Sequence, residues 1–159
     1  MASNAHPNAK GTFVGLSMSH TRAHIARSIY EGIVYCHKTH LEKLLATRAQ
    51  EPECIRLAGG AVKSRVWTQM FADILGYPVE TVEVNETGAL GCAIAVATAV
   101  GAYPSIEEAA RNMCVLGKRI QPNPENAAIY AARYNLYKRA IECLDGLWDP
   151  MQEVIEGRV

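Results

Sequence analysis

The segment Leu57-Ala-Gly-Gly-Ala-Val-Lys-Ser64 has the composition of a ligand-binding loop. Two glycines after a short apolar run let the backbone approach a ligand closely, and a helix that begins after Ser64 would direct free N–H groups to the same place. A nucleotide would suit such a position. The segment is not a Walker A loop, because Val62 rather than glycine precedes Lys63, and it lacks the third glycine of G-x-G-x-x-G. An ordinary strand-to-helix turn is the alternative, since every α/β domain needs such turns.

Two pairs of histidines have the spacing of a helical face. His20 and His24 are four residues apart, and His37 and His40 are three apart. Metal binding would need further ligands, but H-E-x-x-H is absent and no carboxylate or thiolate is placed to complete a first shell with the first pair. We therefore expect exposed or hydrogen-bonded histidines on a helix. Residues 20–22 at the start of that helix could face an anion, or they form a solvated cap.

The sequence offers no clear catalytic base or activated nucleophile. Cys36 is next to His37, but on a helix the two side chains would point about 100° apart, which favours a packed cysteine. No serine stands in G-x-S-x-G. Glu31, Asp73 and Glu86 lie near predicted element ends, where a carboxylate could orient a substrate or a magnesium ion, or serve as a cap or salt-bridge partner.

The elements predicted around the loop form an α/β chain that is richer in helix than in strand. Two strands and one extended segment are fewer than the roughly four to six strands of a typical sheet, so other strands are either unrecognised or supplied from outside this chain. We find no internal repeat and expect one domain. The expected elements are helix 19–48, strand 54–58, helix 65–75 between Ser64 and Gly76, strand 78–84, helix 88–100 capped by Thr87, a short helix after Ser105, extended residues 118–124, and helix 126–145.

Apolar spacing predicts which faces of these helices are buried. The small-residue helix 88–100 is expected to be a packed core helix. Buried residues are expected at Ile25, Ile29, Ile33, Val34, Leu41, Leu44 and Leu45 in the first helix, at Val66, Met70, Phe71, Ile74 and Leu75 in the second, and at Ile129, Tyr130, Tyr134, Tyr137, Ile141 and Leu144 in the last.

The composition narrows the class of protein. With 159 residues, 49% of them hydrophobic and 20% charged, the chain is typical of a soluble globular domain. Sixteen basic and sixteen acidic residues balance, so we expect no nucleic-acid or anionic-membrane partner. Five cysteines without a C-x-x-C pair favour a reducing, cytoplasmic location. The sequence has neither a secretory signal nor the roughly 18 to 20 apolar residues of a membrane span.

Several motifs resemble those of the FGGY carbohydrate kinases. Gly11-Thr-Phe-Val-Gly15-Leu16, followed after seven residues by His24-Ile-Ala-Arg-Ser-Ile-Tyr-Glu31, closely resembles the second signature of that family. In order along the chain, Leu57–Ser64 resembles the family's adenosine loop, and Gln69–Val79 resembles the helix and strand after it. Glu86–Ala95 resembles the E-x-x-A-L-G-A-A helix.

The resemblance implies the fold and the domain organisation. It extends over about residues 11–103 and continues more weakly to the C-terminal helix. The implied fold is the actin/hexokinase-like (ribonuclease H-like) C-terminal kinase domain, helix-rich with a small, incomplete sheet. Residues 1–10 would be a lead-in segment and 11–159 a single C-terminal domain, with the N-terminal sugar-binding and catalytic domain absent.

The resemblance also implies a function. Gly60 and Ser64 would contact the adenine and ribose, with Gly59 and Ala61 shaping the loop. No residue of this chain matches the family's catalytic or magnesium-binding residues. The complete enzyme would use ATP and Mg²⁺ to transfer the γ-phosphoryl group to a hydroxyl of a pentulose such as xylulose or L-xylulose, and the chain alone would be inactive.

Other interpretations stay open. The chain could be a non-catalytic nucleotide-binding or oligomerisation module derived from such a domain, with a homo-oligomer as its assembly. An independent hydrolase that uses Cys36 or the histidines has only composition in its favour. In the kinase interpretation the partners are ATP and, through the N-terminal domain, a sugar.

Overall fold

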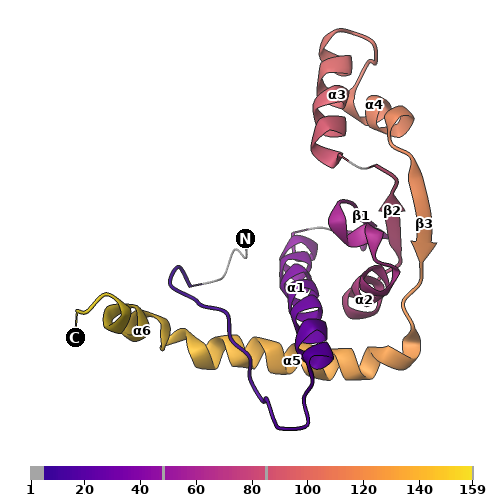
Figure 1. The fold of residues 1–159 in the computed structure, drawn as a ribbon. Helices are drawn as coiled ribbons and strands as arrows, with labels where there is room; N and C mark the ends of the chain where they lie inside the picture. The colour runs from indigo at the N-terminus through magenta and orange to yellow at the C-terminus, as the bar shows by residue number, and fades with distance from the viewer. Residues whose placement is uncertain (1–5, 48, 85, 159) are drawn as a thin grey trace. The chain divides into compact units, whose positions relative to one another are not determined.

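The computed structural model describes residues 6–47, 49–84 and 86–158, which fall into two compact units. One unit combines the chain up to Gln50 with residues from Glu125 onward, and the other is Glu51–Pro124. In chain order the elements are α1 (Arg22–Leu45), β1 (Ile55–Leu57), the 3₁₀ turn η1 (Gly60–Lys63), α2 (Arg65–Leu75), β2 (Val79–Val82), α3 (Thr87–Ala99), α4 (Ile106–Met113), β3 (Leu116–Ile120), α5 (Pro124–Asp145) and α6 (Trp148–Ile155) (Figure 1).

The second unit is built on a three-stranded sheet of order β1-β2-β3. β1 pairs parallel to β2, with Ile55 opposite Val79, and β2 pairs antiparallel to β3, with Val79 opposite Ile120. Because parallel neighbours need a crossover, the chain passes through η1 and α2 between β1 and β2. α2 contacts both β2 and β3. The predicted α/β chain with a small sheet is therefore confirmed. Its extended segment 118–124 is a strand only up to Ile120, because β3 is Leu116–Ile120 and α5 begins at Pro124.

The two ends of α2 lie where the sequence predicts them. The Ser64 hydroxyl oxygen accepts a hydrogen bond from the Trp67 N–H at 3.3 Å. Gly76 adopts the left-handed conformation with φ 79°, and its N–H donates to the Ala72 carbonyl. Predicted burial is confirmed for Met70, Phe71, Ile74 and Leu75, but it is wrong for Val66, which is 67% exposed in the first turn of the helix.

The first unit joins α1 to α5 through a buried carboxylate. Glu31 is 7% exposed and accepts hydrogen bonds from Arg27 Nε at 2.8 Å and, across to α5, from Arg133 Nη1 at 3.2 Å. The Tyr130 hydroxyl contacts the same oxygen at 3.4 Å. The hydrogen bonds to Glu31 and Tyr130 raise the pKa of the Arg27 guanidinium. The predicted salt-bridge role of Glu31 is confirmed.

Burial beside this network raises the pKa of Tyr35 and Tyr134. The Tyr35 ring lies against the Tyr134 ring of α5, with their centroids 5.9 Å apart. The Tyr134 hydroxyl donates to Glu42 of α1 at 2.7 Å. Aromatic packing and charge-assisted hydrogen bonds together hold these two helices.

Other predicted buried faces are only partly covered among the described residues. In α5, Tyr130 and Tyr134 are buried, whereas Ile129 and Ile141 are 49% and 42% exposed. In α1, Val34 is buried, but Ile29, Ile33 and Leu44 are exposed. The reason is that apolar spacing identifies the face of a helix without supplying the element that covers it.

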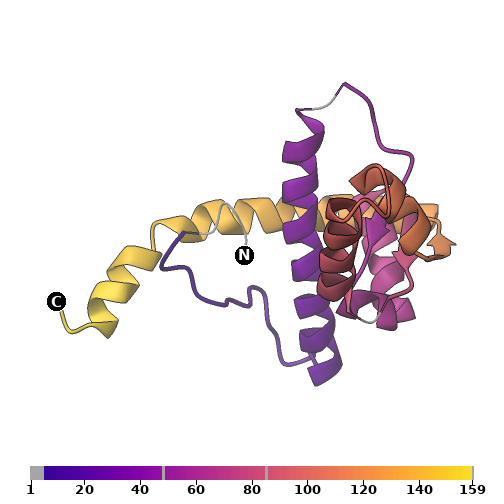
Figure 2. The same cartoon turned by 90° about the horizontal axis from the view of Figure 1, so that it is seen from above.

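The small-residue helix α3 departs furthest from the prediction. None of its described residues is buried, and its principal neighbour is α4, which lies beside it (Figures 1 and 2). The N-cap is Glu86 rather than Thr87, which is the first helical residue. The expected packed core helix is therefore a half-covered hairpin with α4. The helix α6 has no counterpart in the predicted elements.

Two further findings concern the whole described chain. None of its helices has the length and apolar character needed to cross a bilayer. All five cysteines are free thiols.

We predict that Glu31→Ala lowers the free energy of unfolding by about 2 kcal/mol. Removing one partner of a fully buried ion pair costs roughly 3 to 5 kcal/mol, and the cost here is smaller because the Arg27 and Arg133 side chains are 54% and 45% exposed. Urea unfolding of the full chain measures the change.

Glu142→Ala, at an exposed position of α5, is the matched control and should change stability by less than about 0.5 kcal/mol. The double variant Glu31→Ala/Arg133→Ala should lose less than the sum of the single variants. Equal losses for Glu31→Ala and Glu142→Ala would contradict the role given to Glu31.

Candidate nucleotide-binding loop

The junction between β1 and α2 depends on one glycine conformation. Gly59 has φ 85° and ψ −155°, a region of backbone space that residues with a Cβ hardly enter. At Gly59 the chain leaves the direction of β1, and the 3₁₀ turn begins at the next residue, Gly60. In that turn the Val62 N–H donates to the Gly59 carbonyl at 3.3 Å. Glycine at position 59 is therefore required by the backbone itself.

Gly60 is different, because the fold does not require it. Its φ is not positive, and a Cβ built there would have no atom within 4 Å. It opens the 3₁₀ turn, and the first N–H groups of a helical turn have no acceptor within that turn. Gly60 is exposed and Ala61 is half-buried. A ligand can therefore approach the backbone closely at Gly60.

Ser64 and Thr68 fix the end of the loop to α2. Because Ser64 Oγ accepts from the N–H of Trp67 in the first helical turn, its own O–H remains able to donate to a ligand. Thr68 is 1% exposed, and its hydroxyl contacts the carbonyl oxygens of Ser64 at 2.9 Å and Ala61 at 3.3 Å. The sequence analysis missed Thr68, although its position four residues after the cap is a usable signal.

The structure therefore brings Gly59, Gly60, Ala61 and Ser64 together in one rigid loop at the carboxyl end of β1. The donor groups it offers are backbone N–H groups and one hydroxyl. They suit the base and ribose of a nucleotide better than a metal ion, which needs oxygen, nitrogen or sulfur electron pairs. That these residues contact a nucleotide stays a prediction.

The other candidate residues have structural roles. The His24 ring accepts from the N–H of Thr21, the N-cap residue of α1, at 3.0 Å, and the His20 ring accepts from the Ser17 N–H in the preceding turn at 2.9 Å. Both histidines are hydrogen-bonded, as one of the two alternatives predicted. Asp73 is 7% exposed and accepts from Gln69 and from the Asn123 N–H, each at 2.8 Å.

Neither of the two remaining carboxylates forms a metal site. Glu86 is the N-cap residue of α3 but its side chain forms no capping hydrogen bond, and Glu31 forms ion pairs with Arg27 and Arg133. Across residues 6–47, 49–84 and 86–158, no group of three or more histidine, cysteine or acidic side chains is arranged to hold a metal ion.

A cleft of about 930 Å³ lies beside the loop in the second unit. It is bounded by the start of α2, the end of β2 and β3, and its lining includes Val62 and Lys63. None of the four predicted nucleotide-binding residues lines it. This cleft was not predicted from the sequence, because its walls come from segments far apart along the chain.

Comparison with known proteins decides the family. Residues 1–100 match the profile described as the FGGY family of carbohydrate kinases, C-terminal domain. The chain belongs to the FGGY family. Over 151 residues it is 34% identical to the L-xylulose/3-keto-L-gulonate kinase of Escherichia coli (strain K12), an alignment that covers 95% of this chain and 30% of that protein. Over 145 residues it is 32% identical to a probable L-xylulose kinase of Pasteurella multocida (strain Pm70), with 91% and 29% covered.

Solved FGGY structures have the same fold. The xylulose kinase from Lactobacillus acidophilus superposes with a TM-score of 0.79 at 28% identity, covering 91% of this chain and 29% of that one. The xylulose kinase from Rhodospirillum rubrum gives a TM-score of 0.75 at 30% identity, with 90% and 29% covered. The predicted actin/hexokinase-like fold is confirmed. The FGGY chain described here spans about 30% of the length of these relatives.

We predict opposite effects of alanine at the two adjacent loop glycines. Gly59→Ala should lower the free energy of unfolding by about 1 to 3 kcal/mol, because alanine is strained at φ 85°. Gly60→Ala should leave stability unchanged or raise it slightly, since the site has room and alanine reduces the entropy of the unfolded chain. Thermal and urea unfolding measure both, and equal destabilisation would show that Gly60 is also structurally required.

Proposed function

We propose that this chain is the ATP-binding part of an FGGY sugar kinase that transfers the γ-phosphoryl group of ATP to a hydroxyl of a pentulose such as xylulose or L-xylulose. The observation that carries the proposal is the pair Gly59-Gly60. Gly59 is required by the backbone, whereas Gly60 keeps the loop surface open although the fold does not need glycine there. A ligand that lies against the backbone explains the second glycine.

The names of the relatives support the sugar class. The Escherichia coli protein is named an L-xylulose/3-keto-L-gulonate kinase, and the Pasteurella multocida protein a probable L-xylulose kinase. Both are matched over more than nine tenths of this chain. A pentulose or a closely related keto sugar is therefore the substrate class that we propose for the complete enzyme.

The described residues supply only some of the functions that phosphoryl transfer needs. The loop can position adenosine, and positioning is a main part of catalysis in this reaction. Magnesium ligands and a general base for the sugar hydroxyl are not assembled among the described residues, where Glu31 and Asp73 are already bonded to protein groups. We propose that the sugar, the magnesium ion and the catalytic base are held by the part of an FGGY kinase that precedes this region in the relatives.

Calorimetric titration with magnesium ATP tests the nucleotide site. We predict saturable binding to the 159-residue chain and its loss in Gly60→Val, because the valine side chain occupies the surface that the base needs. Gly146→Val is the matched control, since a Cβ there also has no neighbour within 4 Å and the position lies outside the loop. No binding by the folded parent chain, or equal binding by Gly60→Val, would contradict the proposal.

We predict no phosphoryl transfer by the purified chain alone, because the residues that the structure describes assemble no base or magnesium site. A coupled assay for ADP, with xylulose and L-xylulose as acceptors, should show turnover only when the N-terminal region of an FGGY relative is joined to this chain. In that chimera, Gly60→Val should reduce turnover at least tenfold. Turnover by the isolated chain would overturn the proposed division of the enzyme.

An oligomerisation module is a second candidate, favoured by exposed apolar side chains. Phe13, Leu16 and Met18 before α1 are 49%, 55% and 103% exposed, and Val96 of α3 is 60% exposed. Sedimentation of the chain with and without magnesium ATP separates the candidates: a defined oligomer that binds no nucleotide supports the module. The cytoplasmic location and the single domain of residues 11–159 stay predictions.

A further inference from the structure

The cleft beside the nucleotide loop has an excess of positive charge. Its volume is about 930 Å³, and its lining includes Lys63, Arg65, Lys118 and Arg119 but a single carboxylate, Glu83. The protein as a whole carries equal numbers of basic and acidic residues. The excess in the cleft is therefore a local arrangement and does not follow from the composition.

Most of these cations are not neutralised by the protein. Within the described ranges 6–47, 49–84 and 86–158, Lys63, Arg65 and Lys118 have no ion-pair partner within 4 Å. Arg119 donates one guanidinium hydrogen bond to the Glu53 carbonyl at 3.0 Å, which holds its side chain in place. Its other guanidinium N–H groups remain as donors for a ligand. Four cations that line one cleft with a single carboxylate repel one another, and an anion in the cleft would relieve that repulsion.

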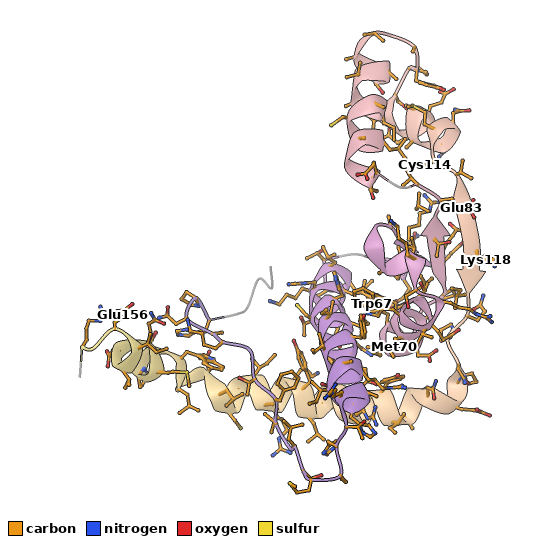
Figure 3. All side chains as sticks on the ribbon, in the orientation of Figure 1. Trp67, Met70, Glu83, Cys114, Lys118 and Glu156 are labelled. Carbon is orange, nitrogen blue, oxygen red and sulfur yellow. The ribbon has the colours of Figure 1, made fainter. Side chains whose placement is uncertain are left out.

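The helix that begins at the cleft adds to the positive potential. α2 has eleven residues and starts at Arg65, so the positive end of its dipole and its first free N–H groups lie at the same wall as Lys63. The opposite wall is β3, which carries Lys118 (Figure 3). Positive groups thus border the cleft from two separate elements.

We propose that this cleft binds the phosphate group of a small phosphorylated molecule, beside the four residues assigned to the nucleotide. A phosphate presents several charged oxygens in different directions, which matches donors that come from α2 and β3 better than a carboxylate with two coplanar oxygens. Val62 and Lys63 of the loop line the cleft, but none of Gly59, Gly60, Ala61 and Ser64 does. The proposed phosphate site therefore adjoins the nucleotide loop and shares none of these four residues.

Glu83 allows a test in which the direction of the change in phosphate affinity is decisive. A Cβ at Gly117 on β3 would come within 2.9 Å of Glu83 Cγ, so the absence of a side chain at Gly117 leaves room for this carboxylate over the strand. Its negative charge opposes an incoming anion. Glu83→Gln removes the charge with little change of shape and should tighten phosphate binding, whereas structural damage would weaken it.

The experiment is calorimetric titration of the full chain with inorganic pyrophosphate at low ionic strength. We expect saturable binding that weakens at least fivefold in Lys118→Ala and in Lys63→Ala, and that tightens in Glu83→Gln. Arg139→Ala, at an exposed position on α5 in the other unit, is the charge-matched control and should bind like the parent. Gly60→Val should also bind pyrophosphate like the parent, which separates this site from the nucleotide loop.

Two results would overturn the proposal. One is a parent chain without saturable pyrophosphate binding. The other is binding that Gly60→Val abolishes while Lys118→Ala and Glu83→Gln leave it unchanged, because that pattern assigns the anion to the nucleotide loop. The same titration is repeated with ribose 5-phosphate and with ribose. Binding of ribose 5-phosphate but not of ribose supports a phosphorylated sugar as the ligand. Binding of pyrophosphate but of neither sugar compound supports free phosphate. Equal binding of ribose and ribose 5-phosphate would contradict recognition of the phosphate.

Discussion

The turn at Gly59 is the constraint on which the sheet-containing unit depends. A parallel pair of strands requires the chain to leave β1, cross over and return to β2, and the crossover has to begin immediately after a three-residue strand. Gly59 achieves this with a conformation reserved for glycine. The direction of the chain after this turn determines where the Ser64 cap and the buried face of α2 lie.

The same turn makes a rigid loop. A flexible loop would lose conformational entropy on binding, whereas this one is already fixed by the 3₁₀ hydrogen bonds, the Ser64 cap and the buried Thr68 hydroxyl. Its exposed N–H groups therefore need no rearrangement to meet a ligand. The constraint that allows the sheet to form also prepares the candidate binding surface, and this explains why one short segment serves both purposes.

The sequence was sufficient for features that depend on local backbone chemistry. Ser64 and Gly76 are a serine N-cap and a glycine C-cap, so the bounds of α2 follow from residue types alone. The Gly-Gly pair identified the loop for the same reason. Even α6 had a local signal, because Pro150 in its first turn is compatible with a helix that starts at Trp148, but the predicted elements end at residue 145.

Features that depend on distant segments were not predictable. Apolar spacing marked faces of α1 and α5, yet Ile29 and Ile141 are exposed because spacing does not say what packs against a face. Glu31 bonds to Arg133 across 102 positions of sequence, and a buried carboxylate between apolar residues has no periodic signal. The cationic cleft likewise combines Lys63 with Lys118, which only the pairing of β2 and β3 brings to one site.

We propose that adenosine lies against the backbone of the Gly59–Ser64 loop. Backbone amide chemical shifts of the ¹⁵N-labelled chain, followed during titration with magnesium ADP, test this placement residue by residue. We expect the largest saturable changes on the amides of Gly60 and Ala61 and their immediate neighbours, with those of β3 little affected. Saturating changes that lie elsewhere and leave the amides of Gly60 and Ala61 unmoved would contradict it.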